Sequence, residues 1–387
     1  MATPGSLEQT IAARQRFFGS ENVHPRTGGL REDRLILSWF GVTNFAMAIR
    51  GHVVLLDAWV PRGAHSGYVP TSPDELALLR PEAILIGHGH FDHAADAVPI
   101  ALATDATLVG TAEHCEDFAT RGPAVPSCIE AVPLGAAAGT SAQPRVLGRV
   151  RVTAVKHLHS AVTAPDGDDG YHVPVTPLPS TTVLEHPPTP EDLLDLLGDL
   201  PDAEGGSVLY RFRVGDFRLV WHDSSGPLTD DAPGALDVLR ALSPVDVHVG
   251  AIQGFNQFTN GLRDPRKYIE ALAPTTFVPA HHDDWAFGIT TNGDAYREPF
   301  FAELERVAAD QRPAVRFIVD PADYLRPEEL TFGLPKRPMR LRARCTRSNR
   351  LRVRLRRDFG RVDRVRFRVA GAGRAAARRD ARPPSTR

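Results

Sequence analysis

One short run constrains this chain more than any other, because it places four potential metal ligands directly after an apolar strand. Residues 83–86 are apolar, and the positions that follow include His88, His90, Asp92 and His93. An apolar run that ends in a glycine-containing turn is typical of a buried strand. Side chains two positions apart in an extended turn face the same way, so His88 and His90 can bind one metal ion. Imidazole nitrogens and carboxylate oxygens are ligands that zinc accepts, which predicts a metal site at the end of this strand.

The spacing His-x-His-x-Asp-His, in which Asp92 and His93 project toward a neighbouring position, resembles the signature of the metallo-β-lactamase superfamily. The resemblance covers roughly residues 35–321. It implies a third histidine, an aspartate that bridges two metals, a last histidine and an early structural aspartate. The chain has candidates for all four in the expected order.

The third histidine lies in the segment VRVTAVKHLHS, which alternates like a strand and ends in His157 and His159. The family's histidine is often followed by a small residue, and Ser160 follows His159, which favours His159 as the ligand. His157 stays an alternative, because it also lies at the end of the strand.

The bridging aspartate is expected to be Asp223, which ends the apolar run FRLVWHD and precedes a Ser-Ser-Gly-Pro turn. Most members of the family have glycine before this aspartate, whereas this chain has His222. Glycine tolerates backbone torsions that histidine does not, so the local backbone geometry is in question. We expect a structural imidazole at His222; a hydrogen-bond donor to the site and an unusual ligand are the alternatives.

The last histidine is expected to be His281, because Pro279-x-His281 follows a short β-rich run and matches the family's Pro-x-His. The next residue, His282, is expected to line the wall of the site or to support a ligand. Earlier in the chain, Asp57 ends the run HVVLLD, where the resemblance implies an aspartate that orients the metal loop. A carboxylate behind a ligand fixes the tautomer of the histidine. The alternative for Asp57 is a helix cap or a loop residue.

Together these positions imply a centre with two zinc ions. The first ion is expected to have three imidazole ligands: His88, His90 and His159. The second is expected to have one carboxylate and two imidazole ligands: Asp92, His93 and His281. Asp223 lies between the ions, and the remaining shared position belongs to a metal-bound water that ionises near neutral pH and acts as the nucleophile. Asp92 can also accept a proton. Iron or manganese are alternative metals.

The order of the expected elements predicts an α/β (α+β) fold. Strands at 35–40, 46–49 and 53–56 follow one another closely, and helices then alternate with strands up to residue 132. The theme repeats from a strand at 207–214 to a strand at 315–319. Two such halves suit the four-layer αββα sandwich of two mixed β-sheets that the resemblance implies, with the metal ligands on loops at one edge. Residues 1–30 are polar and are expected to be an N-terminal extension, and residues 31–335 to be the catalytic domain.

An insertion is expected at residues 161–206, between the third histidine and the next strand. It holds eight prolines, and only residues 191–197 look helical. Long irregular segments in compact domains are usually functional lids or disordered linkers. The position beside a metal ligand favours a lid or a substrate wall, with Tyr171 and His172 as the expected substrate contacts. An exposed proline-rich loop is the alternative.

The formal charge of −2 hides an acidic body and a basic tail. Residues 336–387 contain 20 basic and 3 acidic residues, whereas residues 1–335 contain 25 basic and 44 acidic ones. The tail segments LRARC, LRVRLR and VRFRV alternate apolar and basic residues, which predicts a small basic β-rich appendage. A clustered basic face favours nucleic acid or another polyanion as a partner. Docking on the acidic body and the start of a further β-domain are the alternatives.

The three cysteines, Cys115, Cys128 and Cys345, are far apart and odd in number, so free thiols are expected. No window approaches the roughly 18 apolar residues that span a bilayer. The first residues lack the apolar core of a secretory signal, so a cytoplasmic enzyme is expected.

The leading function is a di-zinc hydrolase that cleaves an ester, lactone or phosphodiester bond in a small molecule. The overall spacing most resembles the branch that contains lactonase-like proteins and N-acyl-phosphatidylethanolamine-hydrolysing phospholipase D. The alternative is a mononuclear-iron oxidoreductase on the same scaffold, similar to the persulfide dioxygenases. A polyanion-binding protein that acts through the basic tail is a further alternative.

Overall fold

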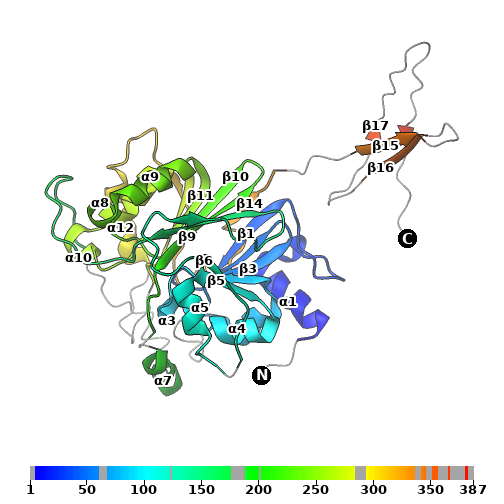
Figure 1. The fold of residues 1–387 in the computed structure, drawn as a ribbon, viewed down its shortest axis with the longest axis horizontal. Coiled ribbons are helices and arrows are strands. Elements are labelled where there is room, and N and C mark those ends of the chain that lie inside the picture. Colours follow the sequence, from blue (N-terminus) through cyan, green and yellow to red (C-terminus); the bar gives the residue numbers. More distant parts are fainter. Residues whose placement is uncertain are drawn as a thin grey trace, which may run out of the picture. The chain divides into compact units, whose positions relative to one another are not determined.

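The computed structural model describes residues 5–60, 68–122, 124–175, 187, 189–199, 202–283 and 293–335, and four short strands in the tail. The chain divides into two compact units, Met1–Pro335 and Lys336–Arg387. Most of the first unit consists of two mixed β-sheets with helices (Figure 1).

The first sheet carries the strand that precedes the histidine-rich run, and its order is β14-β1-β2-β3-β4-β5-β6. Its strands are β1 (Arg34–Trp39), β2 (Phe45–Ile49), β3 (His52–Leu56), β4 (Ala83–Leu85), β5 (Thr107–Thr111), β6 (Cys128–Val132) and β14 (Thr331–Gly333). The pairs from β14 to β3 are antiparallel, and those from β3 to β6 are parallel. Parallel neighbours need crossover connections. These contain α2 (Pro73–Leu78), α3 (Phe91–Ala94), α4 (Ala97–Thr104) and α5 (Ala112–Phe118).

The second sheet repeats this plan in the order β13-β12-β11-β10-β9-β8-β7. Its strands are β7 (Ser141–Ala142), β8 (Arg151–His157), β9 (Ser207–Val214), β10 (Phe217–His222), β11 (Val245–Ala251), β12 (Pro274–Ala280) and β13 (Ala314–Val315). Strands β7 to β10 pair antiparallel, and β10 to β13 pair parallel. The crossovers contain α8 (Leu228–Asp231), α9 (Pro233–Leu242), α10 (Gln257–Asn260), α11 (Arg263–Leu272) and α12 (Asp294–Leu304).

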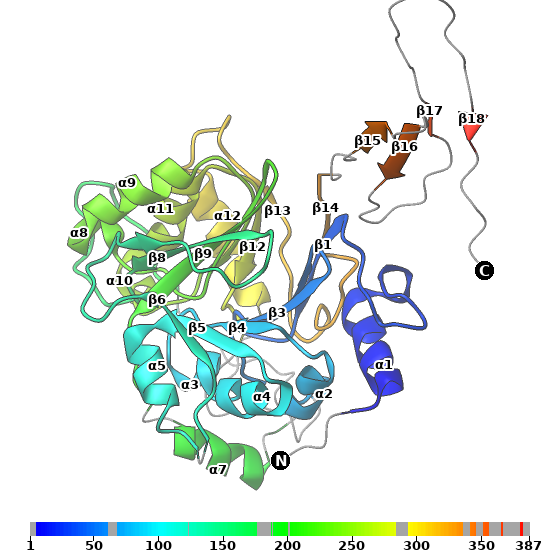
Figure 2. The ribbon, with the colours of Figure 1, turned by 45° about the vertical axis from the view of Figure 1, so that its right-hand side comes forward.

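The sheets pack face to face over the main apolar core, and helices cover their outer faces (Figure 2). Large side chains from both sheets fill this core, among them Trp39, Phe45, Tyr210 and Trp221, all at most 1% exposed. A second apolar cluster joins α9 and α11 to the outer face of the second sheet. The predicted αββα architecture is confirmed.

The first 30 residues differ from the expected extension. They contain α1 (Leu7–Phe18) and a 3-10 turn at Ser20–Asn22. Ser6 caps α1 in a capping box with Gln9, and Phe17 and Phe18 are fully buried in the main core. Only a narrow stripe of this helix is apolar, so its polar composition hides a segment that packs into the body.

The cysteine prediction was wrong, because Cys115 of α5 and Cys128 of β6 form a disulfide. Helix α5 follows β5 directly, and β6 pairs with β5, so the two residues meet across one short connection. A spacing of 13 residues without a framework of further cysteines gave no sequence signal for this bond.

The tail contains β15 (Leu341–Cys345), β16 (Leu351–Leu355), β17 (Val365–Arg366) and β18 (Asp380–Ala381). Strands β15 and β16 pair antiparallel and place Arg342 opposite Arg354 and Arg344 opposite Arg352. The residues that join β15 to β16 and β16 to β17, 346–350 and 356–364, lie outside the described residues. Among the described residues, no helix has the length and apolar character that crossing a membrane requires.

Candidate metal centre

The candidate ligands follow the carboxyl ends of four strands, between one and eight residues beyond each end. His88 and His90 follow β4, and α3, which carries Asp92 and His93, begins immediately after them. From the second sheet, His159 follows β8, Asp223 follows β10 and His281 follows β12. Strand ends of the two packed sheets therefore meet at one edge and bring together residues that are up to 193 positions apart in the sequence.

Three imidazoles form the first ligand group: His88, His90 and His159. Their ligand atoms lie within 4.8 Å of one another, and their ring centroids are 4.6 to 4.9 Å apart. Nδ1 of His159 donates to the carbonyl of Ser160 (2.8 Å), which leaves the Nε2 lone pair free. Burial and the charge of His90 lower the pKa of His159 to about 4, so this ring is neutral and able to bind metal near pH 7.

One carboxylate and two imidazoles form the second ligand group: Asp92, His93 and His281. Nε2 of His93 lies 3.1 Å from Oδ2 of Asp92 and 3.2 Å from Nε2 of His281. Oδ2 of Asp92 and Nε2 of His281 are 3.4 Å apart. Burial favours a neutral Asp92, but the charges of His93 and His281 hold its pKa well below the usual value. Asp92 is therefore an ionised carboxylate in a buried position.

Asp57 fixes the orientation of His93, as expected for an aspartate behind a ligand. Nδ1 of His93 donates to Oδ2 of Asp57 (2.7 Å), which directs Nε2 toward the second group. Asp57 also accepts hydrogen bonds from the hydroxyl of Thr43 (2.8 Å) and the backbone N–H of Gly87 (2.9 Å). Burial and the charge of Asp223 raise the pKa of Asp57 to about 7. Thr43 is a supporting residue that the sequence did not reveal.

Asp223 lies between the two groups. Its Oδ2 is 2.7 Å from Nδ1 of His88 and 3.5 Å from Nδ1 of His93. The carboxylate is fully buried, and its Oδ1 has no hydrogen-bond partner among the described residues. A buried carboxylate oxygen without a partner is costly unless a cation or a donor reaches it. The donor set and this oxygen together fit a divalent metal ion.

Gly87 makes the close approach of the sheets possible at this point. A Cβ at position 87 would lie 2.0 Å from Cγ of Asp223, so no larger residue fits without displacing the carboxylate. The backbone on either side of Gly87 is also tied across the sheets: its carbonyl accepts from the N–H of Val208 (2.7 Å). The hydroxyl of Tyr210 donates to the carbonyl of Ile86 (3.0 Å).

His157 lies outside both ligand groups. Its Nδ1 is 2.9 Å from the hydroxyl of Tyr268, and burial lowers its pKa to about 3. The structure thus brings His159, and not His157, to the other candidate ligands.

His222 replaces the family's glycine without entering the ligand groups. Its Nδ1 donates to the carbonyl of Ser224 (2.7 Å), so its Nε2 accepts from Nε2 of His248 (2.8 Å). Burial lowers the pKa of His222 to about 4. A Cβ at Gly250 would lie 2.6 Å from Nε2 of His222, so a glycine on the neighbouring strand makes room for the ring. A structural imidazole is the role that this geometry gives to His222.

His282 points away from the candidate ligands. Its Nε2 donates to the carbonyl of Pro279 (3.2 Å), and its ring stacks on Phe317 with 5.1 Å between the centroids. The next residue, Asp283, is a support that the sequence did not reveal. It accepts from the backbone N–H of Val42 (2.9 Å) and holds this residue at a φ of 51°. A positive φ is unusual for a β-branched residue, and the carbonyl of Val42 in turn accepts from the N–H of His281 (3.0 Å).

His172 lies inside the fold rather than at the surface, and its role in substrate binding stays a prediction. Its ring is buried, and Nδ1 lies 3.1 Å from both carboxylate oxygens of Glu303. Tyr171 is 76% exposed, and its role in binding stays a prediction.

The described first part of the insertion, residues 161–175, is fixed on α10 and α11. Asp166 pairs with Arg263 (2.8 Å), and Asp169 pairs with Lys267 (2.8 Å) and Arg266. Asn260 donates to the carbonyl of Ala164 (2.7 Å). These contacts suit a wall better than a lid, and they neutralise the acidic pair that lies close to His172.

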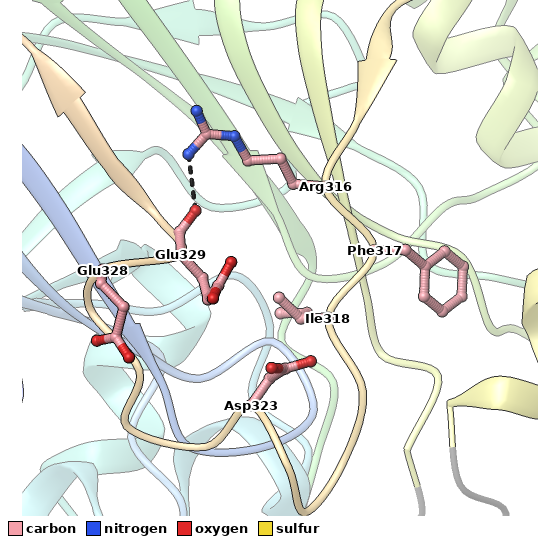
Figure 3. A pocket seen from close by; sticks show the side chains of 6 residues that line it. All are labelled: Arg316, Phe317, Ile318, Asp323, Glu328 and Glu329. Atoms are coloured by element: carbon pink, nitrogen blue, oxygen red, sulfur yellow. Dashed lines mark hydrogen bonds between the residues drawn. The ribbon is translucent and has the colours of Figure 1, made fainter.

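A cavity of about 350 Å³ lies elsewhere, beside β13 (Figure 3). Six residues line it: Arg316, Phe317, Ile318, Asp323, Glu328 and Glu329. Arg316 donates to the carbonyl of Glu329 across it (2.7 Å). None of the candidate ligands lines this cavity, so it is separate from the metal centre.

No family model matches the sequence. The chain is 42% identical over 86 residues to a UPF0173 metal-dependent hydrolase of Pyrobaculum neutrophilum, which covers 22% of this chain and 36% of that protein. It is 27% identical over 158 residues to a protein of the same description from Polynucleobacter asymbioticus, which covers 40% of this chain and 52% of that protein. The chain thus matches about a third to a half of the length of these curated relatives.

Solved structures with a similar fold include the following two. Igni18, described as a novel metallo hydrolase from Ignicoccus hospitalis, is 15% identical with a TM-score of 0.47 and covers 78% of this chain and 100% of its own. The metallo-β-lactamase fold protein YhfI of Bacillus subtilis is 12% identical with a TM-score of 0.43 and covers 74% of this chain and 97% of its own.

Proposed function

We propose that this chain is a member of the metallo-β-lactamase superfamily and a metal-dependent hydrolase with a centre of two zinc ions. The bond that it cleaves is an ester, lactone or phosphodiester in a small molecule. One observation carries the proposal: seven ligand side chains from both sheets form overlapping groups that share His88 and His93. The local similarity to proteins described as metal-dependent hydrolases supports it.

The proposed ligand arrangement follows the geometry. His88, His90 and His159 hold the first ion, and Asp92, His93 and His281 hold the second. Asp223 lies between them. Zinc ions at these positions would supply Lewis acidity to the substrate and lower the pKa of a water molecule for attack.

The protein itself orients these ligands and keeps them in the right protonation state. Asp57 sets the tautomer of His93, and the backbone carbonyl of Ser160 sets that of His159. Asp92 is held ionised, and its Oδ2 lies 3.1 Å from Nε2 of His93 and 3.4 Å from Nε2 of His281, so this carboxylate could accept a proton from a water molecule at the second position.

A cytoplasmic location and a polyanion partner for residues 336–387 stay predictions. The Cys115–Cys128 disulfide weighs against the cytoplasm, because cytosolic thiols are usually kept reduced.

Metal analysis of protein purified without added metal tests the proposal. We expect two zinc ions per chain and hydrolysis of at least one class in a panel of esters, lactones and phosphodiesters. One iron ion per chain, with oxygen uptake in the presence of a persulfide and no hydrolysis, would instead establish the iron oxidoreductase.

A matched pair of variants tests the ligand assignment. His159→Ala removes a proposed ligand and should lower both metal content and activity. His157→Gln keeps a group that can bond to Tyr268 and should leave the metal content unchanged. Loss of metal in the second variant but not in the first would reverse the assignment of the third histidine.

A further inference from the structure

The candidate centre opens on the side of the first ligand group. His90 and His159 are partly exposed, whereas His88, Asp92 and His93 are buried and His281 is 9% exposed. A substrate must reach the metal positions past the exposed ligands. Residues beside His90 and His159 therefore decide which substrates enter.

Phe255 lies beside His159 on this side, with 6.1 Å between the ring centroids. Its ring is 47% exposed, which is unusual for a large apolar side chain at a buried centre. Phe255 belongs to the connection between β11 and α10, which faces the turn that carries His159.

The backbone on both sides of Phe255 is firmly held. A Cβ at Gly254 would lie 2.5 Å from Cβ of Ser160, so the connection packs tightly against the residue after His159. Asn256 is buried and its side chain bonds to Thr163 and Asp264. The exposed ring is thus presented by a fixed backbone rather than by a loose loop, which suits a contact surface.

Near His90, the structure describes a guanidinium beside the candidate ligands, that of Arg121. Arg121 donates to the carbonyl of Gly89, next to His90 (3.4 Å), but it also pairs with Asp117 (2.5 Å) and Asp202 (2.6 Å). Its charge is already compensated by two carboxylates. An apolar ring on one side and a neutralised guanidinium on the other favour a neutral substrate group.

We propose that Phe255 contacts an alkyl or aryl group next to the scissile bond and so selects substrates with a neutral, apolar group at that position. The inference rests on the proposed hydrolase function and specifies the substrate class of the same site. Phe255 is a specificity residue that binds the substrate and takes no part in metal binding.

The test compares the wild type, Phe255→Ala and Phe258→Ala on matched substrate pairs. Phe258 is 51% exposed. Among the described residues, no ring contact joins it to a candidate metal-binding histidine, so it is the matched control. The pairs are p-nitrophenyl acetate and hexanoate, an unsubstituted and a hexyl-substituted γ-lactone, and methyl and phenyl p-nitrophenyl phosphate.

For the pair that the wild type hydrolyses, we expect higher kcat/KM on the larger member. Phe255→Ala should lower kcat/KM for that member about tenfold, equivalent to about 1.4 kcal/mol, mainly through KM. The smaller member should change less than about twofold, and Phe255→Leu should restore part of the preference. Phe258→Ala should behave as the wild type, and zinc content should be equal in all proteins.

Each other outcome overturns the inference in a recognisable way. An unchanged preference in Phe255→Ala, or an equal loss in Phe258→Ala, would remove Phe255 from the substrate site while leaving the hydrolase function standing. A loss of zinc in Phe255→Ala would give the ring a structural role behind His159. No turnover of any pair by the zinc-loaded wild type would overturn the proposed function, and this inference with it.

Discussion

The two ligand groups of the candidate centre differ in how they are enclosed. The first group consists of imidazoles alone, two of them partly exposed, and the backbone carbonyl of Ser160 orients one of them, His159. The second contains the carboxylate of Asp92, is almost completely buried, and is braced by Asp57 and Thr43. The open group is therefore the side at which a substrate arrives, and the closed group is the rigid half of the site.

The largest effect should come from the residue that lies between the two groups. Asp223→Ala removes the carboxylate between the groups and should lower activity by several orders of magnitude, with loss of bound metal. His222→Ala, next to it, should cost only about tenfold, because His222 bonds to Ser224 and His248 rather than to the ligands. Steady-state rates and zinc content of both variants provide the comparison; equal losses would show that His222 is part of the ligand set.

Replacement of Asp57 should have a smaller effect, confined to metal binding by the second ligand group. Asp57→Asn weakens the acceptor for Nδ1 of His93 and should lower metal affinity about 10- to 100-fold at the second position only. Thr43→Val removes the hydroxyl that donates to Asp57 and lies 2.9 Å from Nδ1 of His93, but it leaves the carboxylate of Asp57 in place, so it should have a smaller effect in the same direction. Calorimetric titration of zinc into the metal-free variants should show one weakened step; two weakened steps would mean that the groups are not separable.

The buried imidazoles outside the ligand groups should make the metal-free protein sensitive to acid. Burial lowers the pKa of His157, His222 and His282 to about 3, 4 and 3. Unfolded histidines titrate near pH 6.5, so the unfolded chain binds more protons below this value. Stability is therefore complete above about pH 6.5 and falls toward pH 4, by up to about 1.4 kcal/mol per pH unit for each group.

Urea unfolding of chelator-treated protein at pH 7 and pH 5 measures this loss. His282→Gln should make the pH dependence shallower, because it removes one of the three titrating rings. The ring of His282 contacts Phe317 and Trp39, and no candidate ligand group includes it. A free energy of unfolding that is independent of pH across this range contradicts the prediction.

The smallest effect on the centre should come from the tail. All candidate ligands precede residue 336, where the second compact unit begins. Deletion of residues 336–387 should leave zinc content and turnover of a small neutral substrate within about twofold. Any binding of the intact chain to a polyanion should weaken steeply with added salt and disappear on deletion. Loss of zinc or of folding on truncation would show that the tail is part of the body.

The sequence predicts the fold, and it predicts most directly the candidate ligands that lie together after a single strand. His88, His90, Asp92 and His93 are neighbours, so their spacing is visible without a structure. His159, Asp223 and His281 are single residues at separate strand ends, and only the resemblance gave them an order. The structure brings all seven together, and their binding of metal stays a prediction.

The missed features depend on contacts between distant segments. Helix α1 was hidden because its buried stripe is narrow, and the Cys115–Cys128 bond because its partners meet only once β6 pairs with β5. Gly250 is an ordinary glycine in the sequence, but it makes room for the ring of His222. His172 was predicted to contact the substrate because of its position in the insertion, but its ring is buried against the carboxylate of Glu303, 131 residues away.

Gly87 of the first sheet lies against Asp223 of the second, at the point where the candidate ligands of the two sheets meet. The first sheet contributes His88, His90, Asp92 and His93, and the second contributes His159, Asp223 and His281. Ions held by both sets would be non-covalent cross-links between the sheets, and the free energy of metal binding would add to the free energy of unfolding. A chelator would then act as a denaturant as well as an inhibitor, and metal supply would set the lifetime of the folded chain.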